Sequence, residues 1–499
     1  MTQASPDMMM KPGDVVIDEI TLRSYSGFTM SLKGIFHQFV LYEDIFSNFM
    51  SGYIILIDSQ NLAKNFPIIG AETLTISYKT PLGSGKPVRL VFRTYKISVQ
   101  TETAQQVGQM VRLEFVSHHA IKSMQTKVSK SFINMTVSKM VENIFNEYLA
   151  IDYTENDGSL NNNDLVGKVG QAVTVNNFNP VLQAAKGGFE SRVAAASGLT
   201  KDNLAKQEDQ GKIGLKTVIE TFDARSYVLP YWTPFYAINW LAHRARAKED
   251  ASFCDYVLFQ NSDGHHFVPI SKLKTLEPAF TYTNFPPGFR DNQGERMFLA
   301  ELRNIHSYVI ENKTDKIREQ SIGMLASALL THDITTKKWN TTHFTYDKSF
   351  RNEGNSVDRY PIVPIEKTDY SSAVESHLRF YPKSTFTMEG KTEVNDPNEI
   401  VLLRQSLLAR INAINLIVSC YGDTNVKVGQ IIDFKTESKE STKKQDKFED
   451  DYLSGRYLLT AIKHEVTDRE HLMTMTLSKD SYAEPIADVK KSELSAENP

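Results

Sequence analysis

One pattern of strands and loops occurs twice in this chain of 499 residues, once in its first quarter and once near its end. The strands of the two copies are, in order, 73–78, 88–99 and 110–116, then 431–434, 457–466 and 472–477. In each copy a polar loop follows the first strand, and a tight turn joins the last two. The period-two alternation of apolar and polar residues predicts strands buried on one face. A chain with two copies of one β-module can give a trimer six similar modules around a ring.

Size and composition limit the possible classes of protein. A chain of 499 residues has room for about three or four domains of roughly 100–200 residues each. The net charge of -4 argues against a charge-driven nucleic-acid binder, because such proteins carry a basic face. Two cysteines, Cys254 and Cys420, exclude a disulfide framework and indicate a reducing compartment. We read no signal peptide and no apolar run near the ~20 residues of a spanning helix, so we expect no membrane insertion.

The first 117 residues read as β-structure. Strands are expected at 15–22, 34–41 and 52–57, ahead of the first copy of the repeated pattern. Residues 61–67 predict a short helical turn that Pro67 ends. Residues 1–117 are therefore predicted to form a complete β-barrel or sandwich, the first tube-like β-domain.

Residues 118–275 predict an α+β middle domain. A helix is expected over 137–145, with Asn134 or Thr136 as its cap, and a second helix begins at Thr233 with Pro234 in its first position. A hairpin at 256–259 and 267–270 turns at Asp263-Gly264. Residues 155–216 have little apolar content, so we expect a long insertion that is mobile or ordered only by a partner.

The rest of the chain is predicted to hold a second tube-like β-domain made of residues 276–350 and 412–485. Strands at 305–310, 324–332 and 336–346 are assigned to it. Residues 351–411 between its parts are predicted to be irregular and to end in a helix opened by Asp396, Pro397 and Glu399. The charged loop 436–451 is expected to be solvated, and residues 486–499 to form a flexible tail.

No residue set predicts catalysis, a cofactor or a metal. The loop 81–87 lacks the spaced first glycine of a phosphate loop and has Pro87 where Ser or Thr would bind a metal, so it predicts a hairpin loop. Neighbours on a strand point to opposite faces, so neither histidine pair, His118-His119 or His265-His266, can chelate one ion. Both pairs are expected to be structural or on the surface. No pair of carboxylates stands out as a glycosidase pair.

A cluster of aromatic residues lies between residues 227 and 240, with His243, Arg244 and Arg246 as basic neighbours. Its members are Tyr227, Tyr231, Trp232, Phe235, Tyr236 and Trp240. Such a cluster can stack nucleic-acid bases, but its helical spacing and few basic neighbours favour core packing or a subunit interface.

Residues 44–59 and 65–76, the latter containing Pro67-Ile68-Ile69-Gly70-Ala71-Glu72, resemble the first tube-like domain of tailed-bacteriophage baseplate hub proteins. That T-even-like central hub family is related to the hub modules of contractile injection systems. Residues 425–432 and the hairpin after them resemble the family's second tube-like domain, and the helix at Thr233 resembles the domain between. The insertion 155–216 and the loop 436–451 depart from the family pattern.

The resemblance implies a mainly β fold with two tube-protein-like modules and intervening α+β domains. It implies a homotrimer whose six modules form a ring between a sixfold tail tube and a trimeric spike, with a channel for DNA. Expected partners are a tail tube or tube-initiator protein, a central spike protein and baseplate wedge proteins, and DNA passes without specific binding. An acidic protein suits such a channel, because its walls must not hold phosphates. The expected location is the virion tail baseplate, after assembly in the host cytoplasm.

Two alternatives stay open. One is a tail-associated cell-wall hydrolase, which needs an acid–base or metal constellation that we do not find in the sequence. The other is the hub part of a contractile secretion-system spike, which normally continues into a β-helical needle. Because the chain ends just after its second β-module, we expect any needle to be a separate polypeptide.

Overall fold

The structure is a computed structural model that describes most of the chain. The described residues are 11–24, 27–58, 68–82, 87–101, 109–152, 212–213, 215–222, 224–284, 295–312, 315–353, 356–362, 373–388, 391–395, 400–437, 449–450 and 452–484. Several predicted features lie largely or wholly outside them: the turn 61–67, the insertion 155–216, the helix start at 396–399, the loop 436–451 and the tail 486–499.

The first β-module is an antiparallel sheet of seven strands. They are β1 (Val16–Arg23), β2 (Thr29–Ser31), β3 (Phe36–Asp44), β4 (Ser51–Asp58), β5 (Thr73–Lys79), β6 (Val88–Thr101) and β7 (Gln109–Ser117). Their order in the sheet is β3-β4-β7-β6-β5-β1-β2. Alternate residues of these strands, such as Phe39, Ile54 and Leu113, are buried in one apolar core, as the alternation predicts.

The second β-module repeats this order. Its strands are β15 (Pro278–Asn284), β16 (Ile305–Asn312), β22 (Ile414–Tyr421), β23 (Ile431–Thr436), β24 (Gly455–Thr467) and β25 (His471–Lys479). The order β16-β22-β25-β24-β23-β15 matches β3-β4-β7-β6-β5-β1 strand for strand. One pairing differs: β15 runs parallel to β23, whereas β1 runs antiparallel to β5. The predicted fold class, mainly β with two similar modules, is confirmed.

Two strands that the sequence assigns to the second module belong to another sheet. β17 (Ala326–Asp333) and β18 (Trp339–Thr345) pair with each other, and β17 pairs with β20 (Leu378–Met388), which pairs with β21 (Lys391–Asn395). Residues 351–411 are therefore not simply irregular, because their described part holds β20, β21 and α12 (Val401–Ile411). β20 contains Pro382, and a proline within a run of residues disfavours a strand in sequence-based prediction. The predicted domain boundaries stay predictions, although these pairings place β17 and β18 outside the second module's sheet.

The middle region is α+β, as predicted. Its elements are α2 (His118–Gln125), β8 (Val128–Thr136), α3 (Val137–Ile144), the π-helical turn η1 (Phe145–Leu149), β9 (Ile151–Asp152), β10 (Lys212–Ile213), β11 (Leu215–Val218), β12 (Ala224–Trp232), α7 (Pro234–Ala242), β13 (Tyr256–Asn261), β14 (Gly264–Pro269) and α8 (Ile270–Lys274). Thr136 and Thr233 occupy the cap positions of α3 and α7, but neither side chain caps a backbone N–H. The Thr136 hydroxyl instead pairs with the Ser138 hydroxyl at 3.2 Å.

The remaining described elements are short. They are α9 (Glu295–Leu302), α10 (Lys316–Ser321), α11 (Tyr346–Glu353), the 3-10 turn η4 (Val374–Ser376) and the small strands β19 (Tyr360–Pro361) and β26 (Ser481–Tyr482). Within the described part of the chain, no helix has the length and apolar character needed to cross a membrane.

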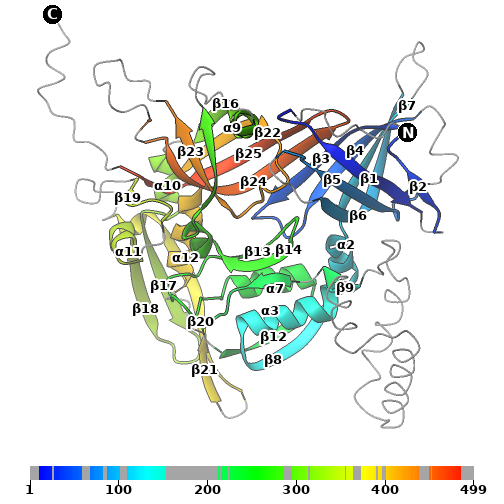
Figure 1. The fold of residues 1–499 in the computed structure, drawn as a ribbon. Coiled ribbons are helices and arrows are strands. Elements are labelled where there is room, and N and C mark those ends of the chain that lie inside the picture. Colours follow the sequence, from blue (N-terminus) through cyan, green and yellow to red (C-terminus); the bar gives the residue numbers. More distant parts are fainter. Residues whose placement is uncertain are drawn as a thin grey trace, which may run out of the picture.

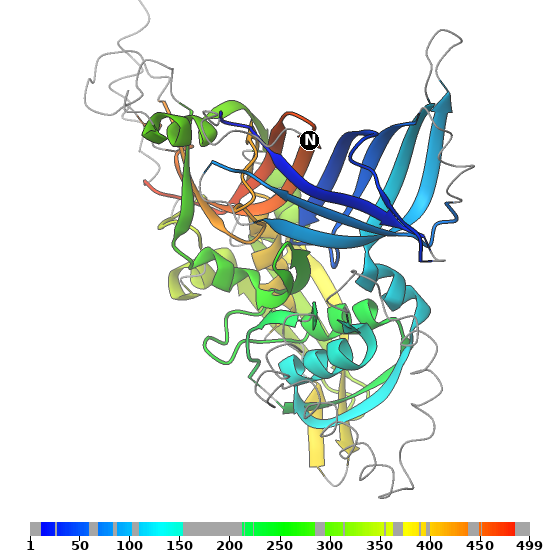
Figure 2. The same ribbon diagram turned by 45° about the vertical axis from the view of Figure 1, so that its right-hand side comes forward.

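The β-modules and the α+β parts lie on opposite sides of the molecule. In Figure 1 the two modules stand side by side across the upper half, and the helices α3 and α7 and the sheet of β18, β17, β20 and β21 lie below them. Figure 2 shows the same division after a turn of the molecule. The chain thus presents one side built of repeated β-modules and another built of elements that occur once.

Candidate assembly interface

The two β-modules are joined edge to edge within one chain. The first half of β24 pairs with β23, from Gly455 to Leu458. Its second half leaves β23 and pairs antiparallel with β3, from Ala461 opposite Asp44 to Thr467 opposite Gln38. Because β3 is the outermost strand of the first module, this joint merges both modules into one continuous sheet.

Cross-strand rows give the equivalence of the two modules residue by residue. The row in the first module is Phe39, Ile54, Leu113 and Ile97 on strands β3, β4, β7 and β6. The row in the second module is Tyr308, Val418, Met475 and Ile462 on strands β16, β22, β25 and β24. Both long strands carry a register shift just before this row, at Thr94/Lys96 and at Leu459/Ala461. β3 therefore corresponds to β16, and β6 to β24.

The same type of turn, held by a side-chain hydrogen bond, precedes the equivalent strands β5 and β23. Glu72 stands directly before β5, and its carboxylate accepts the backbone N–H of Ile69 at 2.7 Å. Gln430 stands directly before β23, and its side-chain oxygen accepts the N–H of Lys427 at 3.0 Å. Both side chains therefore fix a turn three residues back. Gly70 and Gly429 in these turns have φ values of 85° and 90°, which favour glycine.

The equivalence exposes two unused edges. β16 pairs with β22 and with no other described strand, although its counterpart β3 is paired on both sides. The described strands also leave one edge of β6 without a partner strand beyond Arg93, the last β6 residue that pairs with β5. The counterpart edge of β24 holds β3. Val309 on β16 is 60% exposed, and Tyr95 on β6 is 50% exposed. The equivalent residues at the joint, Val40 and Thr460, are 0% and 4% exposed.

Polar side chains reinforce the joint. The Gln38 amide donates to the Glu465 carboxylate at 2.9 Å across β3 and β24. Glu43 on β3 is buried, and its carboxylate accepts the N–H of Val428 from the second module at 3.4 Å. Burial raises the pKa of Glu43 to about 7, although this hydrogen bond and the charge of Lys427 partly oppose the shift.

A buried histidine pair also lies between the modules. Nδ1 of His464 and Nε2 of His471 are 3.1 Å apart, so one proton bridges them. Nδ1 of His471 lies 3.3 Å from the hydroxyl of Thr80, which follows β5 of the first module. Burial lowers the pKa of His464 to about 4 and that of His471 well below its usual value. Both rings are therefore neutral at pH 7.

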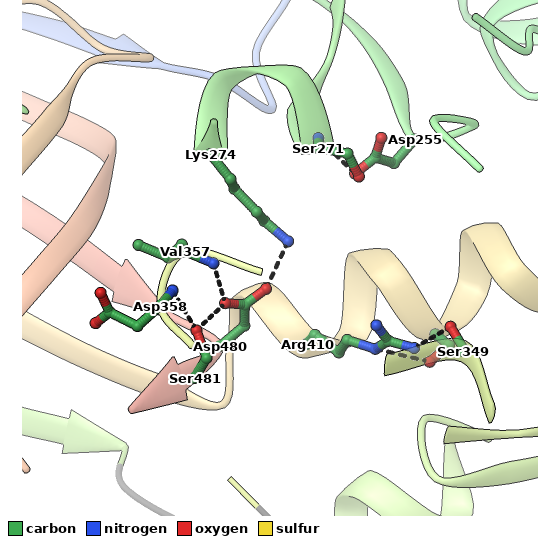
Figure 3. A network of polar contacts seen from close by, with 10 residues as sticks. Asp255, Ser271, Lys274, Ser349, Val357, Asp358, Arg410, Asp480 and Ser481 are labelled. Carbon is green, nitrogen blue, oxygen red and sulfur yellow. Dashed lines mark hydrogen bonds and ion pairs between the residues drawn. The ribbon is translucent and has the colours of Figure 1, made fainter. Parts of the chain in front are cut away.

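A buried ionic network connects the second module to the middle region (Figure 3). Nζ of Lys274 at the end of α8 lies 2.8 Å from the Asp480 carboxylate, and both side chains are 1% exposed. The other Asp480 oxygen accepts the N–H of Val357 and the hydroxyl of Ser481, each at 2.9 Å. Burial alone would raise the pKa of Asp480, but Lys274 and these donors hold it below its usual value. The adjacent Lys479 pairs with Asp358 at 2.9 Å.

The structure brings together one member of each predicted histidine pair. The rings of His119 and His265 lie 4.4 Å apart, next to the Phe145 ring. Burial lowers the pKa of His265 well below its usual value, and the nearby His119 adds to the effect. Among the described residues no group of three or more His, Cys, Asp or Glu side chains is arranged to hold a metal. Sequence reasoning treated the two pairs separately and missed this contact.

The aromatic cluster divides between core and surface. Phe235 is buried in the core of the middle region, and Tyr227, Trp232 and Trp240 pack against that core. The rings of Trp232 and Trp240 lie 5.3 Å apart. Tyr231 and Tyr236 are exposed. The predicted core packing thus holds for part of the cluster. In the loop 81–87, residues 83–86 lie outside the described residues, and its flanks connect β5 to β6.

Comparisons with known proteins show what the whole chain is similar to. No protein-family model matches the chain. "Probable baseplate hub protein gp334" of Vibrio phage KVP40 is 21% identical over 267 residues, which make up 52% of this chain and 60% of that protein. This chain is similar to a phage baseplate hub protein. It matches less than two thirds of that relative's length.

The similarity to this baseplate hub protein confirms the resemblance drawn from the sequence. It also agrees with the expected location in the virion tail baseplate. Two solved structures of tail proteins are also similar over nearly the whole chain. A tail protein from Neisseria meningitidis MC58 has a TM-score of 0.46 and 8% identity, covering 94% of this chain and 97% of its own. The 43 kDa tail protein of prophage MuSo2 from Shewanella oneidensis has a TM-score of 0.47 and 8% identity, covering 93% and 99%.

Proposed function

We propose that this chain is a structural virion protein, the central hub of a phage tail baseplate, and that it works as a homotrimer. The observation that carries the proposal is the joint between β3 and β24, which occurs once within the chain, while the described strands leave the equivalent edges of β16 and β6 open. Three chains supply six modules. If the same kind of edge-to-edge pairing also joins β16 of one chain to β6 of the next, every module has two neighbours. The similarity to a phage baseplate hub protein supports this role.

The proposed contact between chains has a definite register. Strand β16 of one chain pairs antiparallel with the second half of β6 of the next chain, as β3 pairs with β24. Val40 lies opposite Glu465 at the joint within the chain, so the equivalent pair between chains is Val309 and Gln100. The two edges differ, so the contact is heterologous and closes into a ring. Pairing also covers an apolar edge strand that would otherwise invite aggregation.

The arrangement of layers supports an adaptor role. All the modules would lie on one side of the ring and all the α+β parts on the other, following their places in one chain (Figure 1). Six similar modules suit a sixfold tail tube or tube-initiator protein, whereas three copies of the α+β parts suit a trimeric central spike. Baseplate wedge proteins would bind the outside of the ring. A net charge of -4 suits a channel through which DNA passes without being held.

The proposed role is structural and includes no catalytic step. Purified protein should therefore fail to clear peptidoglycan or polysaccharide substrates. Clearing that one point mutation abolishes would favour the alternative of a tail-associated cell-wall hydrolase.

The mass of the purified chain in solution tests the trimer. Native mass spectrometry or light scattering should give three times the chain mass of 56.5 kDa, either alone or after a spike or tube partner is added. A stable dimer or tetramer under both conditions would reject the hub proposal.

A further inference from the structure

A cavity of about 490 Å³ opens between the middle region and the sheet of β18, β17, β20 and β21. Its walls come from α7 and the residues just after it, from β20 and from α12. The lining includes Tyr236, Trp240, His243, Arg244, Arg379 and Arg404. Three of these residues carry a guanidinium group, and none of the described lining residues carries a carboxylate. In a chain with a net charge of -4, this local excess of positive charge needs an explanation.

Two of the arginines are fixed in place by the protein. The Arg404 side chain is only 7% exposed, and its terminal nitrogens donate to the carbonyls of Cys254 and Tyr256 at 2.8 and 2.9 Å. Arg244 stacks on the Trp240 ring at 3.6 Å and donates to the Tyr381 hydroxyl at 3.3 Å. The protein therefore holds both guanidinium groups in place at the cavity, and Arg404 is the more deeply buried of the two.

The other two basic residues are more open to solvent. Arg379 on β20 is exposed. His243 follows α7, and partial burial together with the charges of Arg404, Arg244 and Arg379 lowers its pKa to about 4. The imidazole is therefore neutral at pH 7 and can still donate one N–H. The nearby carboxylate that acts on Arg404 is Asp255, which already accepts from the N–H and hydroxyl of Ser271.

We propose that this cavity binds an organic polyanion through its carboxylate or phosphate oxygens. Arg244, Arg379 and His243 supply donors for the oxyanion, and Arg404 adds buried positive charge. The Trp240 and Tyr236 rings cover the apolar part of the ligand. The volume lies within the range of small-molecule sites, roughly 300–1,000 Å³, and it exceeds the needs of a bare phosphate. The anion is either a free metabolite-like molecule or the acidic side chains of a partner segment, since both present the same oxygens.

Isothermal titration calorimetry at pH 7 and low salt tests the site on the whole chain. The probes are citrate, inorganic phosphate and an acetylated Glu-Glu-Glu tripeptide. R379Q should weaken binding about tenfold, the size of one charge-assisted hydrogen bond, and R379K should restore part of it. R469Q is the matched control, because Arg469 is an exposed arginine on the turn between β24 and β25.

The results distinguish a free anion, an acidic segment of a partner and the absence of an anion site. Binding of citrate or phosphate that depends on Arg379 supports a free anion, and binding of the tripeptide alone supports a partner's acidic segment. Binding should also shift the His243 imidazole resonance, which H243Q identifies by its loss. No binding by any probe, or equal binding by R379Q and R469Q with both folded by circular dichroism, overturns the proposal. The site lies within one chain, so this result stands apart from the outcome for the trimer.

Discussion

Val40 on β3 and Val309 on β16 occupy equivalent positions in the two β-modules, yet Val40 is 0% exposed and Val309 is 60% exposed. The difference has a local cause: β24 covers the edge of β3, and no described strand covers the edge of β16. An isolated edge strand with an exposed branched apolar residue is an aggregation hazard. In the proposed ring, β6 of another copy of the chain covers this edge.

A charge on the β16 edge should block assembly without unfolding the chain. V309K places a desolvated ammonium in the proposed contact, so the protein should run as a monomer. The thermal midpoint of this monomer should change little, because Val309 is exposed and surface substitutions alter stability by about 0.5 kcal/mol or less. V228K is the matched control, since Val228 on β12 is also 60% exposed but lies away from both edges. A V309K protein that still forms trimers would contradict the proposed register.

Replacing Glu43 should stabilise the joint at alkaline pH. Burial raises the folded pKa of Glu43 from 4.5 to about 7, so the folded state binds more protons than the unfolded state between these values. Its contribution to stability is therefore present below pH 4.5 and falls as pH rises toward 7, by about 3 kcal/mol at most. E43Q cannot ionise, so urea unfolding should show it more stable than the natural protein at pH 8. The difference in unfolding free energy between the two proteins should be smaller at pH 5. A difference that does not depend on pH would show that ionisation of Glu43 is not its cause.

The buried histidine pair should make the chain less stable as pH falls, whereas Glu43 makes it less stable as pH rises. The folded pKa of His464 is about 4, below the unfolded value of 6.5, so the unfolded state binds more protons in this window. Stability from this group is complete above pH 6.5 and is lost as pH falls toward 4. In H464Q the slope of the unfolding free energy against pH should therefore be smaller by about one proton between pH 6.5 and 4. An unchanged slope would mean that His464 titrates normally.

Breaking one side of the buried ion pair should destabilise the chain more than removing both sides. D480N leaves the Lys274 ammonium buried without a counter-charge, which costs about 3–5 kcal/mol. The double variant K274M/D480N removes the buried charge, so it should recover part of that loss. Thermal unfolding followed by circular dichroism compares the three proteins. A double variant less stable than D480N would show that the ion pair is not the source of the effect.

The sequence predicted the modules well and their connections poorly. Period-two alternation marks which residues of β7 or β24 face a core, because burial of one face leaves a pattern in the chain. β5 is an exception, because Thr73 to Tyr78 are all buried, so the strand is covered on both faces and not on one as predicted. The alternation does not say which edge pairs with which. The strands β17 and β18 read like strands of the second module, but they pair with each other, and β17 pairs with β20, far along the chain.

The candidate interface could be predicted only in part. The resemblance implied six modules in a ring, but the register of the contact depends on which residues lie opposite each other in the paired strands. Nothing in the sequence separates Val40 from Val309, since both are branched apolar residues on strands of similar pattern. The contact of His119 with His265 was likewise invisible, because it depends on the packing of α2 against β14 and not on spacing.

The most direct test of the central claim is a cysteine pair across the proposed ring contact. V309C and Q100C in one chain would lie opposite each other between neighbouring copies, with Cα atoms about 4.5–5.5 Å apart as in any antiparallel pair. Cys254 and Cys420 are buried, so the new thiols are the reactive ones. Mild oxidation followed by denaturing electrophoresis without reductant should give covalent trimers, and either single variant should give monomers. Oxidation of the double variant that stops at dimers, or yields no cross-linked species at all, would contradict the ring.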